Sequence, residues 1–467
     1  MPPTLALILW LLLLLALFRF DPAKDPDTSL ALWVPLIWIF IIASRLPSQW
    51  LRSQMGTAAQ AFEEGNPLDR TIFFLLIVLA ASILISRAFP WGLFFIRNFV
   101  LIAFLLYALA SVLWSDFPFV AFKRWFRDLG NYFVILVVLS DPRPLEAVRT
   151  LLRRLGYLLI PLCILLDKYF PGLSKQYDNW SGAAMYAGAT TGKNLLGLVA
   201  LLSGLFFFWD TITRWSGRKE RRTKRIIQVN IAFLVMSLSL LFTANSATCR
   251  VCMVLGCLII AAAHSKFFLR HPTFLKVLVP GTFCLYLILS LGFGMSGDLA
   301  AAVGKDPTLT DRTKIWAFVL SMHTNPVLGT GYESFWLGHR LEWIWQQAGL
   351  GGLTEAHNGY LEVFLNLGVV GLLLLTGFLL ASYRNICRYL ATSANIASLY
   401  LALWAIMLFY SVTEVGFRSG LIWLVFLLGG VAAPKRSVDP VDSVAAIDAA
   451  RRKRFSDPRL ETASQRR

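Results

Sequence analysis

Long apolar runs follow one another along almost the whole chain, with short polar segments between them. A helix needs about 20 apolar residues to cross the ~30 Å hydrocarbon core of a bilayer, and most of the runs approach that length. The pattern predicts an all-α, polytopic membrane protein with about twelve or thirteen transmembrane helices. The runs cover residues 4–20, 29–44, 71–87, 97–114, 129–140, 155–168, 194–210, 226–243, 251–264, 277–294, 359–381, 397–413 and 419–433.

Lysine and arginine are concentrated in four polar segments, 143–154, 214–225, 384–388 and 451–454. Short cytoplasmic loops are enriched in these residues, so we expect all four segments on the cytoplasmic side. The mixed charges of residues 45–70 leave the orientation of the first two runs open. Alternation of the later helices puts the remaining long segments on the extracytoplasmic side: 115–128, 169–193, 244–250, 295–358 and 414–418.

Composition agrees with a membrane protein, because 57% of the residues are hydrophobic and only 15% are charged. The net charge of +17 follows from the basic loops, so we expect no nucleic-acid partner. The six cysteines lie in or beside apolar runs and are interpreted as small core residues. Cys249 and Cys252 have CxxC spacing, but no second pair completes a zinc site, so no metal is expected.

The chain divides into a transmembrane domain over residues 1–433 and a tail over residues 434–467. The tail is polar and basic and contains three prolines, which predicts a disordered cytoplasmic segment. The longest extracytoplasmic loop, residues 295–358, lies within the transmembrane domain. Residues 308–322 of this loop are expected to form a short amphipathic helix.

Several charged residues lie at the extracytoplasmic ends of the predicted helices, where the positive-inside rule disfavours cations. Arg124 and Arg127 therefore suggest contact with an anion. Lys193 lies at the start of a predicted helix, where backbone amides favour an anion, but interfacial anchoring is favoured over phosphate contact for this residue. Glu362 and Glu414 lie at helix ends, and for both we favour structural pairing with an arginine over catalysis.

The sharpest local pattern is His357-Asn358 followed, after nine residues, by Gly368-Val-Val-Gly371. A histidine at the mouth of a membrane helix provides a proton-accepting group at the membrane surface. Gly368 and Gly371 would let a neighbouring helix approach closely. Taken alone, this pattern favours simple capping and packing over chemistry.

Three segments follow one another around this pattern: Asp311-Arg-Thr-Lys-Ile-Trp316, Asn325-Pro-Val-Leu-Gly-Thr-Gly-Tyr332 and Ala356-His-Asn-Gly-Tyr-Leu-Glu362. In this order and spacing they resemble the O-antigen ligase and exopolysaccharide polymerase superfamily of Wzy-type bacterial membrane proteins. Gly192-Lys-Asn194 and Asn245-Ser-Ala-Thr248 are similar to its succinoglycan-polymerase-type branch. The resemblance covers about residues 115–430.

The resemblance implies a GT-C-like membrane glycosyltransferase of the bacterial inner membrane, with its active site on the periplasmic side. Its donor would be an oligosaccharide linked to undecaprenyl diphosphate, and it would need neither a nucleotide sugar nor a metal or other cofactor. The acceptor would be a glycan, as in a polymerase, or lipid A core, as in a ligase. A chain-length regulator and export machinery would be its partners, and the branch favours a polymerase.

Residue roles follow from the same resemblance. Arg312 matches the family arginine of the periplasmic loop, and His357 matches the essential histidine. Arg250 lies close in sequence to the position of a second family arginine, although the segment Ser-Ala-Thr-Cys-Arg250 differs from the usual family motif. The guanidinium of an arginine can bind a diphosphate leaving group through two parallel, charge-assisted hydrogen bonds. His357 would either take the acceptor proton or orient the donor phosphate, and both roles stay open.

Supporting roles are expected for Asn358 beside the histidine and for Asp311, which would cap its helix or hold Arg312 in place. The main alternative function is a secondary transporter of a polar or anionic substrate, because many helices and few intramembrane charges suit one equally well. Transporters place substrate near the bilayer midplane between internal repeats. Here the charges collect at one face, and the two halves show no repeat.

Overall fold

The computed structural model describes residues 1–24, 28–52, 65–177, 182, 184–292, 312–347, 352–392 and 394–432. Within these residues the chain is almost entirely helical, and a two-stranded antiparallel sheet pairs β1 (Lys175–Tyr177) with β2 (Ala184–Tyr186). The predicted all-α architecture is confirmed. Asp311, the 434–467 tail and residues 295–311 of the large loop lie outside the described residues.

The first part of the chain forms helices that run up to the small sheet. They are α1 (Pro3–Phe20), η1 (Leu30–Leu32), α2 (Trp33–Ala43), α3 (Pro47–Trp50), α5 (Pro67–Ser86), α6 (Trp91–Arg97), α7 (Phe99–Ala110), η2 (Ser111–Trp114), α8 (Pro118–Leu139), α9 (Pro144–Tyr169) and α10 (Pro171–Ser174).

The second part begins after the sheet and includes the two short helices of the large loop. Its elements are α11 (Lys193–Arg214), η3 (Trp215–Gly217), α12 (Arg221–Ala244), α13 (Ala247–His264), α14 (Lys266–Arg270), α15 (Pro272–Leu287), the π-helical turn η4 (Ile288–Gly292), α17 (Arg312–Leu320), α18 (Gly338–Gln347), α19 (Gly359–Thr392), α20 (Ala394–Thr413) and α21 (Leu421–Gly430).

Every predicted apolar run coincides with a helix of the structure. In the described part of the chain, eight helices are long and apolar enough to cross a membrane. The number rises to nine if α6 and α7, which meet at 92°, count as one bent span. The expected count of twelve or thirteen is higher because α2 and α21 are short, and because the first halves of α8 and α9 carry several charges.

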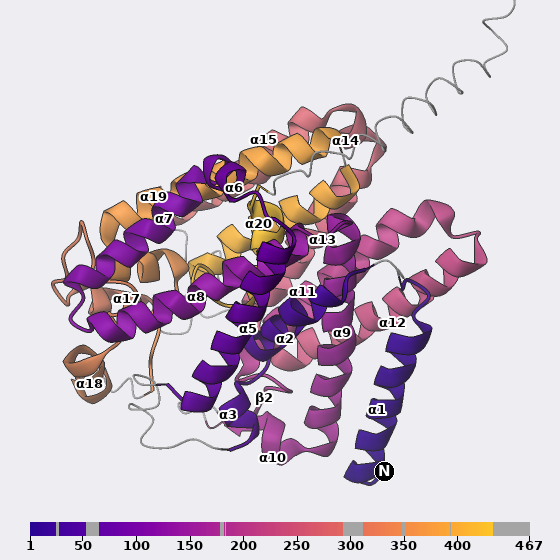
Figure 1. Cartoon of the computed structure of the whole chain (residues 1–467), viewed down its shortest axis with the longest axis horizontal. Helices are drawn as coiled ribbons and strands as arrows, with labels where there is room; N and C mark the ends of the chain where they lie inside the picture. The colour runs from indigo at the N-terminus through magenta and orange to yellow at the C-terminus, as the bar shows by residue number, and fades with distance from the viewer. Residues whose placement is uncertain are drawn as a thin grey trace, which may run out of the picture.

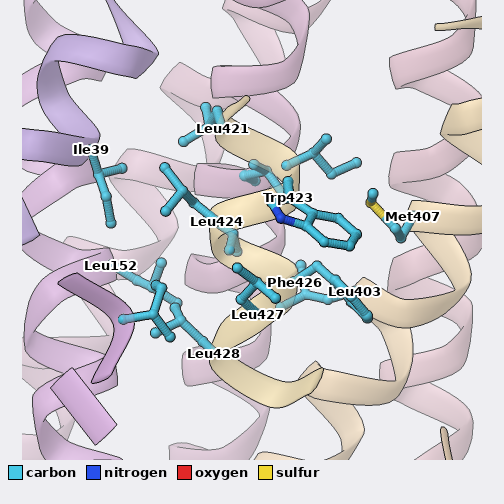
Figure 2. Close-up of a cluster of buried hydrophobic side chains, with 14 of the residues drawn as sticks. Ile39, Leu152, Leu403, Met407, Leu421, Trp423, Leu424, Phe426, Leu427 and Leu428 are labelled. Atoms are coloured by element: carbon cyan, nitrogen blue, oxygen red, sulfur yellow. The ribbon is translucent and has the colours of Figure 1, made fainter. Parts of the chain in front are cut away.

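The short helix α21 fills the centre of the bundle (Figure 2). All of its residues are buried, and it packs against α20, α19, α8, α11 and α2. A helix that is hydrophobic on every side must be enclosed by other helices or by lipid, and here protein encloses it. Leu424 and Leu428 point toward Ile39 and Leu152, while Trp423 lies near Met407 (Figure 2). This core fixes the helices whose ends carry the site.

Helix α1 lies at the edge of the bundle (Figure 1), and only 6% of its spanning stretch is buried within the protein. Its main contact is α9. The long helices α7, α8 and α19 instead run toward the end of the molecule that carries α17 and α18 (Figure 1). The two helices of the large loop therefore cover the ends of the membrane helices.

Helix α11 runs between two polar regions at opposite ends of the bundle. Asn194 in its first turn donates to Glu414, whereas Asp210 near its last turn binds Arg153 and Arg214. Its 22 residues correspond to a length of about 33 Å, which is close to the thickness of the hydrocarbon core. The carboxylate of Asp210 joins two of the predicted cytoplasmic basic segments, so these segments lie at the same end of the bundle.

Candidate active site at the ends of helices α11, α17, α19 and α20

The start of α19 and the end of α20 are held together by their backbones. The amide of Gly359 donates to the carbonyl of Glu414 at 3.0 Å. Asn358 caps α19, because its side-chain oxygen accepts hydrogen bonds from the amides of Tyr360 and Leu361. His357, which directly precedes this cap, has φ +48° and thus lies in the left-handed region. Non-glycine residues rarely adopt this conformation outside turns and functional sites.

Glu414 collects three donors from three different elements. Arg312, at the start of α17, binds it at 2.7 Å and also donates to the carbonyl of Thr413. The Nδ1 atom of His357 lies 3.6 Å from Glu414, and the amide of Asn194 donates to it at 3.2 Å. The structure therefore brings together the arginine and the histidine that the sequence singles out, and the expected pairing of Glu414 with an arginine is confirmed.

A second carboxylate completes the environment of the histidine. The Nδ1 atom of His357 lies 3.0 Å from Glu355, two residues earlier in the chain. Arg312 and Glu414 are buried, with 8% and 4% of their surfaces exposed, whereas the side chain of His357 is 27% exposed. The imidazole and the Glu355 carboxylate are thus the accessible part of the group, and the Arg312–Glu414 pair lies beneath them.

The neighbouring carboxylates shift the pKa of the His357 imidazole. Burial lowers the pKa of His357, but Glu355 and Glu414 outweigh it and raise the pKa to about 9. Burial likewise raises the pKa of Glu355, but His357 outweighs this effect and lowers it. At neutral pH the pair therefore consists of an imidazolium and a carboxylate.

Glu355, His357 and Glu414 are also a possible ligand set for a metal ion among the described residues. Their donor atoms all lie within 4.8 Å of one another. One imidazole and two carboxylates match common divalent-metal sites, although Arg312 already occupies one side of Glu414. The positive charge of Arg312 next to a shared ligand opposes the binding of a cation.

A second charged group lies on the same side. Arg418, in the connection between α20 and α21, binds Glu333 at 2.6 Å. Burial lowers the pKa of Arg418, but the carboxylates of Glu333, Glu362 and Glu355 outweigh it and raise the pKa above its usual value. Arg418 therefore pairs with the loop before α18 and lies within electrostatic range of Glu355 and Glu362.

The two arginines of α8 belong to this second group. Arg124 donates to the backbone carbonyl of Glu333 at 2.6 Å, and Arg127 pairs with the neighbouring Asp128 at 2.9 Å. Asp128 also accepts a hydrogen bond from Tyr332 at 2.8 Å. The side chain of Arg127 is 46% exposed, so part of its guanidinium faces outward.

Arg250 and Lys193 lie at the rim of the site. Arg250 is in the first turn of α13 and donates to Asn245 at 2.9 Å. The hydroxyls of Thr248, in the same turn, and Thr413 lie 2.8 Å apart, so the start of α13 adjoins the end of α20. Lys193 directly precedes Asn194, which binds Glu414. Both cations are thus brought to the same end of the bundle as Arg312.

The expected pairing of Glu362 with an arginine gives way to a different network. Its carboxylate accepts hydrogen bonds from Trp336, from the backbone amide of Ala356 and from Asn366. These contacts tie the loop before α18 and the segment before His357 to the first turns of α19. Glu362 therefore holds two loops together through hydrogen bonds. Its partners are an indole and amide groups, and not the expected arginine.

Gly368 also has a different role from close helix packing. It has φ +64° and ψ −164° and breaks α19, and a Cβ at this position would overlap the carbonyl group of Val327. The break frees backbone groups that pair with the loop: the amides of Thr330 and Gly331 donate to Leu365 and Asn366. Gly368 thus allows the close approach of a loop and not of a neighbouring helix. Gly371 lies in helical backbone one turn later.

The sequence interpretation missed Glu355, Glu333 and Arg418. Arg418 shares the signal that identified Arg124, namely a cation in a segment expected on the extracytoplasmic side. Glu355 lies two residues before His357, so its proximity could have been noted. Glu333 gave no local signal, because only the tertiary fold brings it to Arg418.

Two comparisons with known proteins found similar sequences. Residues 181–376 match the O-antigen ligase family. The chain is also 25% identical over 358 residues to the exopolysaccharide production protein ExoQ of Rhizobium meliloti (strain 1021), covering 72% of this chain and 77% of the relative. Together with the all-helical membrane architecture, these matches support the resemblance of the chain to the O-antigen ligase and exopolysaccharide polymerase superfamily.

Proposed function

We propose that this protein transfers glycans from undecaprenyl diphosphate to a glycan acceptor at the periplasmic face of the inner membrane, and that it acts as a polymerase. The observation that carries the proposal is the junction at Glu414, where Arg312 and His357 meet although 44 intervening residues separate them in the sequence. A cationic pair at the membrane surface suits a lipid-linked diphosphate.

The position of the site supports the periplasmic assignment. Asn194 and Asp210 mark opposite ends of α11, and Asp210 binds arginines of two basic segments. Because basic segments are enriched on the cytoplasmic side, the end that carries Glu414 faces the periplasm. The tail after α21 would then be cytoplasmic.

In the proposed reaction, Arg312 and the imidazolium of His357 bind the donor diphosphate. The acceptor hydroxyl oxygen attacks the anomeric carbon of the donor sugar, and the bond from this carbon to the diphosphate oxygen breaks. The leaving undecaprenyl diphosphate takes the bonding electron pair, and the two cations stabilise its growing charge. The carboxylate of Glu355 accepts the proton of the hydroxyl.

Of the two roles left open for His357, this mechanism takes the phosphate-orienting one. A pKa of about 9 leaves little neutral imidazole at pH 7, so His357 is poorly suited as the base. The two protein cations also supply the charge neutralisation that metal ions provide in many phosphate-dependent enzymes, so the proposed reaction needs no metal.

The choice of a polymerase rests on the relative, which is named as an exopolysaccharide production protein. In this role the acceptor is a second lipid-linked repeat, and a chain-length regulator and export machinery are the expected partners. In a ligase the acceptor would be lipid A core. The two activities use the same donor and leave different intermediates when they are lost.

The test is a deletion of the gene in its host, followed by complementation with wild type, His357→Ala, Arg312→Ala and the control His339→Ala. His339 is a fully exposed histidine of the same large loop. Surface and secreted glycans are analysed by gel, and lipid-linked glycans are extracted and sized. We expect wild type and His339→Ala to restore long polymer, and the other two variants to lose it by about 100-fold or more.

The lipid fraction separates the alternatives. Accumulation of a single lipid-linked repeat supports the polymerase, whereas accumulation of full-length lipid-linked polymer would indicate a ligase. Unchanged glycans in the deletion strain would contradict both and favour a transporter. Full activity of His357→Ala and Arg312→Ala, at equal protein levels in the membrane, would contradict the proposed site.

A further inference from the structure

A small pocket lies between α1 and α9, at the end of the molecule opposite to Glu414. Leu17 and Phe18 of α1 form its apolar wall. Its polar wall contains Lys24, Arg153 and Arg154, together with one acidic residue, Asp21. Thr150, Ala23 and Tyr157 complete the lining. The pocket thus has an apolar part and a cationic part, as an amphipathic anion requires.

Helix α1, beside the pocket, is largely exposed on the outside of the bundle. Only 6% of the spanning stretch of α1 is buried within the protein, and its main neighbour is α9. Leu17 and Phe18 lie in the last turn and a half of α1, directly before the polar turn at residues 21–24. An acyl chain running beside α1 would therefore bring its headgroup to the level of Lys24 and Arg154.

Arg154 is the cation best placed to receive a headgroup. Its guanidinium carbon lies 6.0 Å from the ring centre of Phe18 and 5.4 Å from that of Trp33. Stacking on the two rings holds the guanidinium plane in place. Among the described residues, no carboxylate lies within ion-pair distance of Arg154, whereas Arg153 is paired with Asp210.

The remaining charges leave the pocket cationic. Asp21 accepts hydrogen bonds from the hydroxyl of Tyr157 at 3.2 Å and from the amide of Ala23 at 2.9 Å. Arg222 donates to the carbonyl of Pro22 at 2.9 Å and so adds a cation beside the turn. Among the described residues around this turn, the positive charges of Lys24, Arg154 and Arg222 exceed the one negative charge of Asp21, and Lys24 is exposed.

We infer that this pocket binds an anionic phospholipid of the cytoplasmic leaflet, with its phosphate at Arg154 and Lys24 and an acyl chain along Leu17 and Phe18. Cationic pockets between membrane helices on the cytoplasmic side suit anionic headgroups. The inference concerns lipid binding alone and does not depend on the glycan chemistry at Glu414. Bound lipid would fill the space under α1 and fasten this helix to the bundle.

The test measures lipid binding to the purified full-length protein in detergent by native mass spectrometry. Phosphatidylglycerol is the anionic probe, and phosphatidylethanolamine is the zwitterionic one. The test variant is Lys24→Gln/Arg154→Gln, and the matched control is Arg218→Gln/Lys219→Gln, which removes the same charge from the same end of the protein. We expect the affinity for phosphatidylglycerol to fall about fivefold for each charge removed in the pocket and to stay unchanged in the control.

Three results would overturn the inference: equal binding of both lipids to wild type, an equal loss in the test and control variants, or displacement of phosphatidylglycerol by millimolar inorganic phosphate. The last result would indicate a site for a soluble anion. Arg154→Lys keeps the charge and should retain most of the binding, so a loss caused by misfolding is separated from a loss of charge. Unchanged polymer formation by the test variant would show that the fold and the glycan site are intact.

Discussion

At the scale of single residues, the site combines cations and carboxylates in contact. Arg312 is buried and must keep an acidic partner, because an unpaired buried charge is costly. Glu414 provides that partner. His357 is more exposed and has two acidic neighbours, which keep it protonated. The protonation state of His357 is therefore the property of the site that responds most directly to pH.

We predict that glycan transfer decreases as the pH rises through about 9. The pKa of His357 is raised to about 9, so the imidazolium is present below this value and is lost above it. Glu355→Gln removes one of the carboxylates that raise the pKa, and it should move the alkaline limit to lower pH while also lowering the rate. The measurement is the initial rate of purified protein with a lipid-linked donor, in buffers from pH 6 to 10 containing EDTA.

Thermal unfolding of the same samples is the control, since a loss of folded protein would also lower the rate. A rate that instead rises with pH as His357 loses its proton would indicate that the neutral imidazole acts as the base. Abolition of the rate by EDTA, with restoration by a divalent ion, would assign the Glu355–His357–Glu414 group to metal binding.

At the scale of elements, the break in α19 is the feature that attaches the large loop to the membrane domain. The amides of Thr330 and Gly331 pair with carbonyls of α19, and the amides of Val369 and Val370 pair with Pro326 and Val327. These groups would pair within the helix if α19 were continuous. The loop therefore replaces helical hydrogen bonds that the break removes.

We predict that Gly368→Ala destabilises this attachment strongly. Its backbone lies in a region of φ and ψ that is nearly restricted to glycine, where strain costs about 1–3 kcal/mol, and the added Cβ would overlap Val327. The variant should unfold at a lower temperature in detergent than wild type does, and its activity should also be lower. The control is Gly377→Ala, a helical glycine of α19 whose Cβ would meet Val100 at 3.1 Å. Equal stability of the two variants would contradict a structural role for the break.

The helices could be predicted from hydropathy because a bilayer requires long apolar runs, and each run became a helix. The role of Gly368 could not, because a glycine in an apolar helix equally permits close packing, and only the loop at Val327 distinguishes the two. Arg312 and His357 were identified by resemblance. Their common partner Glu414 could not be assigned to them, since 56 residues lie between His357 and Glu414.

At the scale of the whole molecule, the two polar ends of the bundle differ in composition. One end carries paired cations and carboxylates around Glu414 and Arg418. The other carries the basic segments around Asp210, where Arg149, Arg153 and Arg214 approach one carboxylate. The first end suits the capture of an anionic substrate, and the second suits retention on the cytoplasmic side.

We predict that a membrane-impermeant maleimide labels Glu342→Cys in intact cells whose outer membrane is permeable, and labels Arg218→Cys only after the inner membrane is opened. Glu342 is exposed on α18 at the end that carries Glu414, and Arg218 is exposed near the end of α11. Wild type measures labelling of the six native cysteines. The reverse pattern would place the glycan site in the cytoplasm and contradict the proposed topology.

Glu414 and Glu355 together balance the charges of Arg312 and His357 within the protein itself. In the proposed reaction, an incoming diphosphate exchanges places with the Glu414 carboxylate, so the net gain on binding is smaller than for two bare cations. The same exchange operates in reverse once the glycan has moved, because Glu414 can reclaim its partners as the spent lipid carrier departs. The carboxylate of Glu414 would thus weaken substrate binding and speed release of the carrier, which suits the proposed polymerase, because a polymerase repeats the transfer many times on one growing chain.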